Sequence, residues 1–128
     1  MSEIKQKQKD KSSIGRKVSK KEFKRRERIA VKKQFKDWSI AVRARDGNKC
    51  VICQATKYIH SHHILPKEAK IYHYLRFDIN NGISLCANHH KYSYEISPHK
   101  NPFVFITWLH ANRLNQFDYL AEKLFNIK

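Results

Sequence analysis

The chain has 128 residues, a length most simply explained by one domain whose modest core would benefit from a bound metal ion. Lys and Arg outnumber Asp and Glu by 27 to 11, and the formal charge of +16 favours a polyanionic partner such as nucleic acid. The longest apolar run, residues 103–109, is far shorter than the ~20 residues of a membrane span, and the N-terminus lacks the apolar region of a signal peptide. We therefore expect a cytoplasmic protein with no membrane partner.

The N-terminal part of the chain is the most basic. Residues 1–37 hold 15 Lys and Arg against 5 Asp and Glu. Residues 1–19 have almost no apolar side chains, so we expect a disordered basic arm. Residues 20–47 predict a basic amphipathic helix that ends where a glycine can adopt the left-handed conformation. Its apolar stripe consists of Val31, Phe35, Trp38 and Val42. These charges suit either a phosphate-binding arm, whose affinity falls steeply with salt, or a solvated helix face with a solubility tail.

The cysteines fall into two half-sites that suit a structural zinc ion. Cys50 and Cys53 form a C-x-x-C pair, and Cys86 is followed three residues later by His89. An odd number of cysteines, two of them in such a pair, indicates metal or redox chemistry rather than disulfides. Three thiolates and one imidazole make a closed tetrahedral set of zinc ligands. The alternative is that the thiols are buried or surface groups that do not come together in the fold. The long separation of the half-sites predicts that zinc closes a large loop.

Two strands are predicted between the half-sites. Residues 58–65 are apolar or aromatic with interspersed histidines, which favours a strand. Residues 77–86 join an Asn-Asn-Gly turn signal to a short β-branched run, which predicts a turn and a strand. A helix is expected over 87–97. Because neighbouring side chains of a strand point to opposite faces, His62 and His63 cannot bind one ion in the same way.

The C-terminal part, residues 101–128, is expected to be a helical appendage packed on the core. It follows a breaker-rich link, and a break near Asn112 divides it into two helices. Their apolar residues at helical spacing are Phe103, Ile106, Trp108 and Leu109 in the first helix, and Phe117, Leu120, Leu124 and Phe125 in the second.

The segments DGNKCVICQ, IHSHHILP and LRFDINNGISLCANHHK together resemble the HNH endonucleases, which are nucleases with the ββα-metal fold. The resemblance is to the small zinc-knuckle members of bacteriophages and bacteria, and it covers about residues 38–100. It implies an α+β domain with a zinc-stabilised HNH core over 48–100, flanked by the N-terminal basic helix and the C-terminal helices. It also implies the cytoplasm of a bacterial or phage-infected cell.

The resemblance implies a role for four residues. His62 and His90 would bind a catalytic divalent ion, His63 would be the general base, and Asn81 would brace the loop and orient His63. Mg²⁺ is the expected ion, with Mn²⁺ or another transition ion as alternatives. The chemistry of phosphodiester hydrolysis supports these separate roles for ion ligands and base, since it needs a base that activates water and a cation that stabilises the phosphoryl charge.

Two departures from the family's commonest pattern bear on the metal sites. His89 stands where many relatives have a second cysteine, so either it completes the zinc set or it exchanges roles with His90. Tyr94 stands where some relatives have a third ion-binding histidine, which predicts only two protein ligands for the catalytic ion. We expect His60 to be a core or hydrogen-bonding residue. The other histidines are expected to be surface or structural residues: His73, His99 and His110.

The loop between the strands offers cations and tyrosines whose roles stay open. The cations could equally well contact phosphates or belong to a solvated loop; they are Lys67, Lys70 and Arg76. The tyrosines could stack on bases or pack in the core; they are Tyr72 and Tyr74.

The sequence thus predicts a metal-dependent endonuclease that hydrolyses DNA, with double-stranded DNA as the expected partner. The alternative is a noncatalytic zinc-ribbon module that binds DNA or RNA, which explains the zinc set and the charge but not the four HNH residues. A third interpretation is an HNH protein that nicks one strand within a larger homing or packaging system. Sequence preference and the choice between monomer and homodimer stay open.

Overall fold

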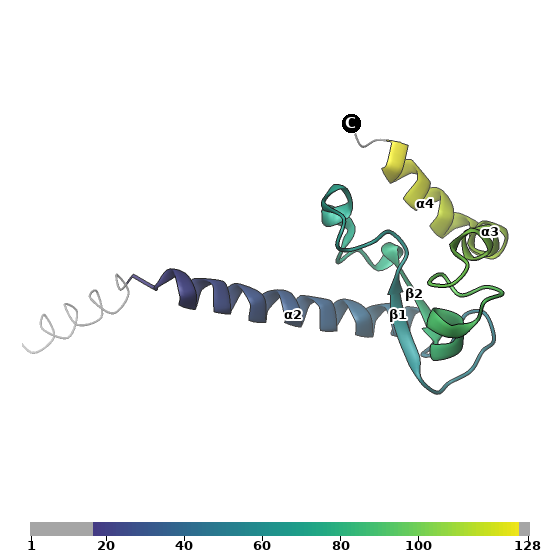
Figure 1. The fold of residues 1–128 in the computed structure, drawn as a ribbon, viewed down its shortest axis with the longest axis horizontal. Helices are drawn as coiled ribbons and strands as arrows, with labels where there is room; N and C mark the ends of the chain where they lie inside the picture. The colour runs from purple at the N-terminus through teal and green to yellow at the C-terminus, as the bar shows by residue number, and fades with distance from the viewer. Residues whose placement is uncertain (1–16, 126–128) are drawn as a thin grey trace, which may run out of the picture. The chain divides into compact units, whose positions relative to one another are not determined.

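The protein is described by a computed structural model over residues 17–125, and its contacts divide the chain into two units, residues 1–33 and 34–128 (Figure 1). All but the last three residues of the predicted disordered arm lie outside the described range. Helix α2 (Lys20–Arg45) supplies residues to both units.

Both ends of α2 follow from local chemistry. The hydroxyl of Ser19 accepts a hydrogen bond from the Glu22 amide at 3.1 Å, which caps the first turn. The helix ends at Arg45, two residues before the predicted end, and Gly47 has a φ of +75°, so the predicted left-handed glycine is confirmed. In the second unit Trp38 and Val42 are buried, as the apolar stripe predicted.

A two-stranded antiparallel sheet forms the centre of the second unit. Strand β1 (Ile59–His63) pairs with β2 (Gly82–Cys86), with Ile59 opposite Cys86 and His63 opposite Gly82. The connection contains two short 3₁₀ segments, η1 (Lys70–Leu75) and η2 (Ile79–Asn81). Every residue of β2 is buried. Helices and a small sheet make the architecture α+β, as expected.

The segment after β2 differs from the prediction. A helix was expected over 87–97, but only a short π-helical turn, η3 (Asn88–Tyr92), forms there. Ser93 has an extended backbone, and the hydroxyl of Ser97 donates to the carbonyl of His90 at 2.7 Å. The hydroxyl thus satisfies a carbonyl that a longer helix would have bonded through its own backbone.

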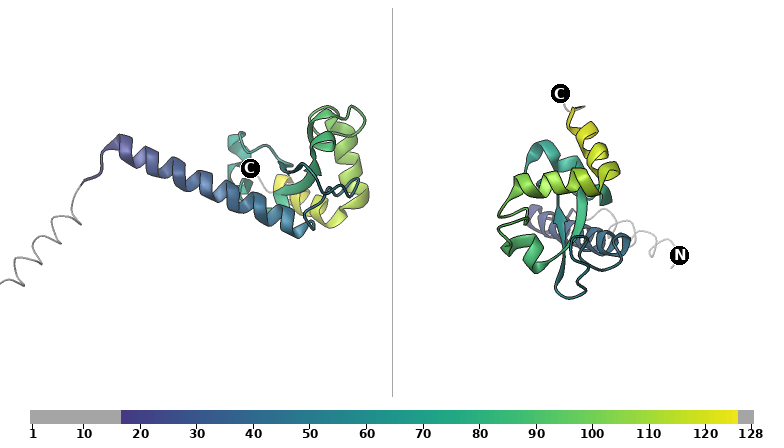
Figure 2. Two further views of the ribbon diagram at one scale, coloured as in Figure 1. Left: turned by 90° about the horizontal axis from the view of Figure 1, so that it is seen from below. Right: turned by 90° about the vertical axis from the view of Figure 1, so that its right-hand side faces the viewer.

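Two helices complete the second unit. Helix α3 (Pro102–Asn112) begins with Asn101 as its cap, and α4 (Leu114–Phe125) packs against it (Figures 1 and 2). The predicted face of α3 is wrong in part: Phe103 is 80% exposed, whereas Phe105 and Leu109 are buried. These two side chains join a core with β2 and the cysteines, namely Cys50, Ile83, Leu85, Cys86, Phe105 and Leu109. No helix within residues 17–125 is long and apolar enough to cross a membrane.

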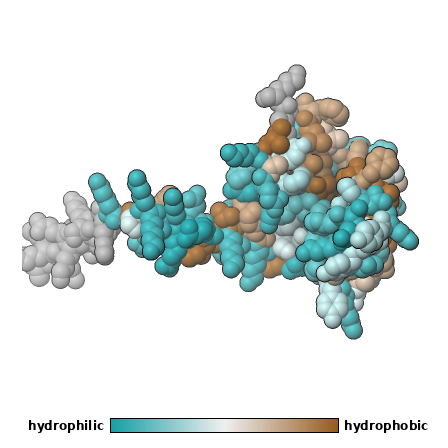
Figure 3. Space-filling model, in the orientation of Figure 1, coloured by the Kyte–Doolittle hydropathy of each residue, from teal (hydrophilic) through white to brown (hydrophobic). Residues whose placement is uncertain are grey.

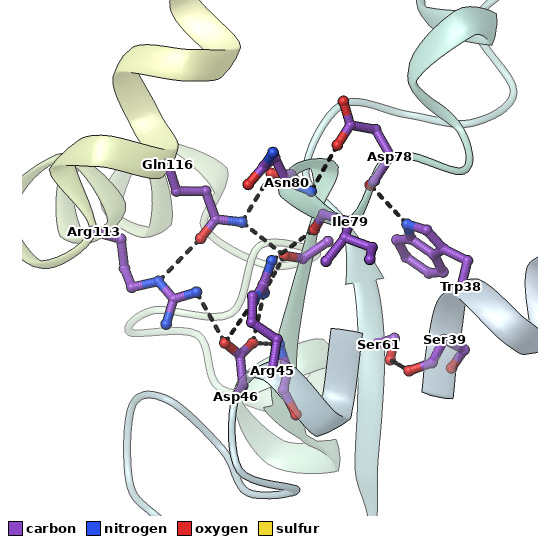
Figure 4. A network of polar contacts seen from close by, with 12 residues as sticks. Trp38, Ser39, Arg45, Asp46, Ser61, Asp78, Ile79, Asn80, Arg113 and Gln116 are labelled. Carbon is purple, nitrogen blue, oxygen red and sulfur yellow. Dashed lines mark hydrogen bonds and ion pairs between the residues drawn. The ribbon is translucent and has the colours of Figure 1, made fainter. Parts of the chain in front are cut away.

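A network of charges links the end of α2, β2 and α4 (Figure 4). The Asp46 carboxylate pairs with Arg45 at 2.8 Å and with Arg113 at 3.0 Å, and it accepts a hydrogen bond from the Ser84 amide at 2.9 Å. Gln116 donates to the carbonyl of Gly82 at 2.7 Å and accepts from Arg113. These bonds hold β2 in place between the two helical segments.

Candidate active site

Three cysteines and one histidine come together where β2 ends. Cys50, Cys53, Cys86 and His89 each bring one sulfur or ring nitrogen to within 4.8 Å of the others. The measured separations are 3.6 Å from Cys50 Sγ to His89 Nδ1, 3.8 Å between the sulfurs of Cys53 and Cys86, and 3.3 Å from Cys86 Sγ to His89 Nδ1. A tetrahedral zinc ion places such ligand atoms roughly 3.6 to 3.8 Å apart. The four residues therefore fit a zinc ion, and we call them the zinc cluster.

A tight turn presents the first two cysteines. The Cys50 amide donates to the carbonyl of Ala55, the Gln54 amide donates to the carbonyl of Cys50, and Gln54 has a φ of +66°. Burial alone would raise the pKa of the Cys50 thiol, but hydrogen bonds from the backbone amides of Cys86, Cys53 and Ile52 lower it overall. A lowered pKa favours the thiolate, which is the form that binds zinc.

Three histidines form a second group, separate from the zinc cluster. His62 comes from β1, His90 from η3, and His99 from the turns before α3. One nitrogen of each lies within 4.8 Å of the others, and the Nε2 atoms of His90 and His99 are 3.1 Å apart. Two imidazole nitrogens bound to adjacent positions of one ion at ~2.1 Å would be about 3.0 Å apart. These residues, which we call the three-histidine cluster, fit a single metal ion.

Two histidines of this cluster, His62 and His90, have lowered pKa values and are therefore neutral near pH 7. Burial, together with the charges of His90, His99 and His63, lowers the pKa of His62 to about 3. Burial, then His99, His60 and Lys91, lowers the pKa of His90 to about 4. A neutral imidazole offers its lone pair to a metal without first losing a proton.

His63 lies on the opposite face of β1, as its position in the strand predicted. Its Nε2 is 2.8 Å from the carbonyl oxygen of Arg76, and its ring stacks on Trp38 with centroids 3.8 Å apart and planes 9° apart. Because a carbonyl only accepts, Nε2 must carry the proton, and neutral His63 keeps a free lone pair on Nδ1. Burial is the main cause that lowers the pKa of His63, with a contribution from Lys67.

Asn81 is fully buried and fixes the connection that contains Arg76. Its side-chain oxygen accepts from the Leu65 amide at 2.7 Å, and its side-chain nitrogen donates to the carbonyls of Leu65 at 3.0 Å and Leu75 at 3.2 Å. Leu75 precedes Arg76, whose carbonyl holds His63. Asn81 therefore holds the backbone next to the carbonyl that contacts His63, an arrangement consistent with the bracing role predicted for it.

One cleft joins these groups. A cleft of about 620 Å³ is lined by His62, His90 and His99, and also by His63 and Lys67. His60, on the same strand face as His62, lies behind the cluster: its Nδ1 is 3.0 Å from Nδ1 of His90. The hydrogen-bonding role expected for His60 is confirmed.

His99 is the residue that sequence reasoning missed. It was expected to be a surface or structural residue, and Tyr94 predicted an ion site with two protein ligands, but the structure brings His99 to His62 and His90. The only signal in the sequence is its position in the segment PHKNPF, nine residues after His90. The structure also separates the adjacent histidines, since His89 joins the cysteines and His90 joins His62.

A comparison with protein families bears on the segment that carries the zinc cluster and two of the three clustered histidines. A family model described as HNH endonuclease matches residues 50–93. This match supports the resemblance of the segment to the HNH endonucleases. The HNH match contains the zinc cluster and His62, His63, Asn81 and His90, and it ends before His99. The match points to nuclease-type chemistry on nucleic acid for this segment. Comparisons with curated proteins and with solved structures found no match.

Proposed function

We propose that the protein is a metal-dependent endonuclease that hydrolyses phosphodiester bonds of DNA, with His63 as general base. The main support for the proposal is that His63, with a lone pair on Nδ1, lines the same cleft as three histidines that fit a metal ion. Hydrolysis requires a base and a cation on one reacting phosphate, and this cleft offers both.

The chain's own residues supply a defined proton path. Nδ1 of His63 takes a proton from the attacking water, and the imidazolium that results keeps its Nε2 hydrogen bond to the Arg76 carbonyl. That bond raises the pKa of His63 against the effect of burial, so it helps the ring to hold the proton. The stacked indole of Trp38 fixes the ring plane, which keeps Nδ1 in one direction.

His62, His90 and His99 would hold the catalytic ion, and Asn81 would hold the loop that orients His63. When bound, the ion supplies a Lewis acid that stabilises charge on the phosphoryl and leaving oxygens. Three imidazoles suit a transition ion better than Mg²⁺, which prefers oxygen ligands and retains water. We therefore propose Mn²⁺ or another transition ion in place of the Mg²⁺ expected from the sequence.

The zinc cluster would have a structural role, because four protein ligands leave no position for substrate. Two of its cysteines belong to the hydrophobic core, next to Phe105 and Leu109. Zinc would thereby join the turn after α2 to the end of β2. A noncatalytic zinc-ribbon function would use this cluster alone and would give no reason for the three-histidine cluster.

Cleavage of supercoiled plasmid tests the proposal. The zinc-loaded protein should nick or linearise plasmid DNA with Mn²⁺, Co²⁺ or Ni²⁺ added, and more slowly with Mg²⁺. His99→Ala should lower the rate by at least about tenfold at limiting ion, since one of three ligands is lost. His110→Ala is the matched control, because His110 is an exposed histidine whose ring packs edge-on against Phe117. DNA binding without cleavage under every ion would favour the zinc-ribbon alternative.

A further inference from the structure

Four cations line one face of the first half of α2. Lys21, Arg25, Arg28 and Lys32 follow one another at steps of four, three and four residues, and all four are exposed. At about 100° per residue they fall within an arc of roughly 60°. We call these residues the basic stripe. All of them lie within the first unit of the chain.

Acidic residues are kept away from the basic stripe. The acids of this stretch, Glu22 and Glu27, lie about 90° or more from its centre by the same geometry. Glu22 pairs instead with Arg26, off the stripe, at 2.9 Å. Across the described part of the chain, no ion pair engages any of the four stripe cations. Their charge is thus available to a partner.

The apolar residues of the same stretch argue against a membrane surface. Phe23, Ile29 and Val31 are spread around the helix rather than gathered on one face, and Phe23 and Ile29 are 63% and 56% exposed. An amphipathic membrane helix needs a continuous apolar face opposite its cations. The view in Figure 3 shows mostly hydrophilic side chains over this part of α2.

We infer that the basic stripe binds the phosphates of duplex DNA, an inference that deepens the proposed function by naming the surface that holds the substrate. The stripe extends over about 17 Å at 1.5 Å per residue. A duplex of that length carries about ten phosphate charges, and each phosphate neutralised by Lys or Arg releases counterions. Four aligned cations therefore match the negative charge along one stretch of DNA backbone, and the contact is independent of base sequence.

The test compares two variants that lose the same charge from the same helix. One is Lys21→Gln/Arg25→Gln/Arg28→Gln/Lys32→Gln. The control is Lys20→Gln/Lys24→Gln/Arg26→Gln/Lys33→Gln, whose cations lie on the other faces of α2. Both sets are made in the full chain with His63→Ala, so that no DNA is cut, and circular dichroism checks helix content. Fluorescence anisotropy with a duplex of about 30 base pairs then gives affinity from about 50 to 200 mM NaCl.

The stripe variant should lower the slope of log affinity against log salt by about 3 to 4, because each B-DNA phosphate contact contributes about 0.9. The control should lower it by less than about 1. Equal losses in the two variants would overturn the inference, since net charge alone would then explain binding. An unchanged slope in the stripe variant would overturn it as well. Neither result depends on cleavage, so failure of the nuclease proposal is recognised separately in the plasmid assay.

Discussion

Removal of the Asp46 charge is expected to destabilise the second unit. The Asp46 side chain is 2% exposed and holds two arginines and one backbone amide. These bonds link the end of α2 to β2 and to Arg113, which lies between α3 and α4 (Figure 4). Asp46→Asn keeps the shape but loses the negative charge, and its NH₂ group must face a guanidinium or the Ser84 amide. Two donors are then left without a good acceptor.

The expected loss can be bounded from the burial of the partners. Loss of one member of a buried ion pair costs about 3–5 kcal/mol, because the remaining charge has no partner. The side chains of Arg45 and Arg113 are 28% and 26% exposed, so water recovers part of that cost. We expect the free energy of unfolding to fall by about 2–3 kcal/mol.

The pH dependence of this loss has a definite sign. Burial would raise the pKa of Asp46, but the hydrogen bond from Arg45 and the charges of Arg113 and Arg45, with the Ser84 amide, lower it below its ordinary value. A lowered pKa contributes stability above the unfolded-state pKa, and this stability is lost as pH falls through the folded-state pKa. The difference between wild type and Asp46→Asn should thus be constant from about pH 8 to 5 and shrink below about pH 4.

Urea denaturation of the zinc-loaded proteins at several pH values measures this difference. Zinc ligands protonate in acid in both proteins, so only the difference between them is interpreted. Asp118→Asn, at an exposed aspartate of α4, is the control and should change the free energy of unfolding by less than about 0.5 kcal/mol. A loss below about 1 kcal/mol for Asp46→Asn, or a difference that grows in acid, would refute the account of the network.

Three further outcomes follow from the site. Cys53→Ser, or removal of zinc by a chelator, should abolish the cooperative unfolding transition, and a native-like transition in the apo protein would contradict a structural zinc. His60→Ala should weaken ion binding at least about tenfold, as measured by titration calorimetry. His60→Asn keeps an acceptor near the His90 Nδ1 and should recover most of the lost affinity. Equal losses of affinity in the two variants would exclude a positioning role for His60. Gly82→Ala would put a methyl group against Val42 and 2.6 Å from the Trp38 ring, and should cost about 1–3 kcal/mol in thermal unfolding. An unchanged stability would contradict this tight packing.

The sequence predicted those features that depend on local periodicity or on a fixed chemical set. The α2 stripe identified Trp38 and Val42 because helical spacing alone selects a buried face. The alternation of a strand separated His62 from His63. The grouping of the cysteines with His89 followed from zinc chemistry, which admits few ligand sets.

The features that the sequence did not predict depend on tertiary contacts. His99 reaches the cluster through irregular turns, whose path no periodicity encodes. The helix expected over 87–97 is shortened because the Ser97 hydroxyl replaces a backbone bond. The stacking of Trp38 on His63 joins residues 25 positions apart in sequence, and no short motif marks such a pair.

The role of His63 as general base is tested by single-turnover cleavage of supercoiled plasmid by wild type, His63→Ala and His73→Ala, each zinc-loaded and supplied with Mn²⁺. His73 is a histidine of η1 that serves as the matched control. Wild type and His73→Ala should cut at similar rates, while His63→Ala should lose at least about 100-fold and retain its fold, its zinc and its DNA affinity. Cleavage by His63→Ala at the wild-type rate would contradict the assignment of the general base.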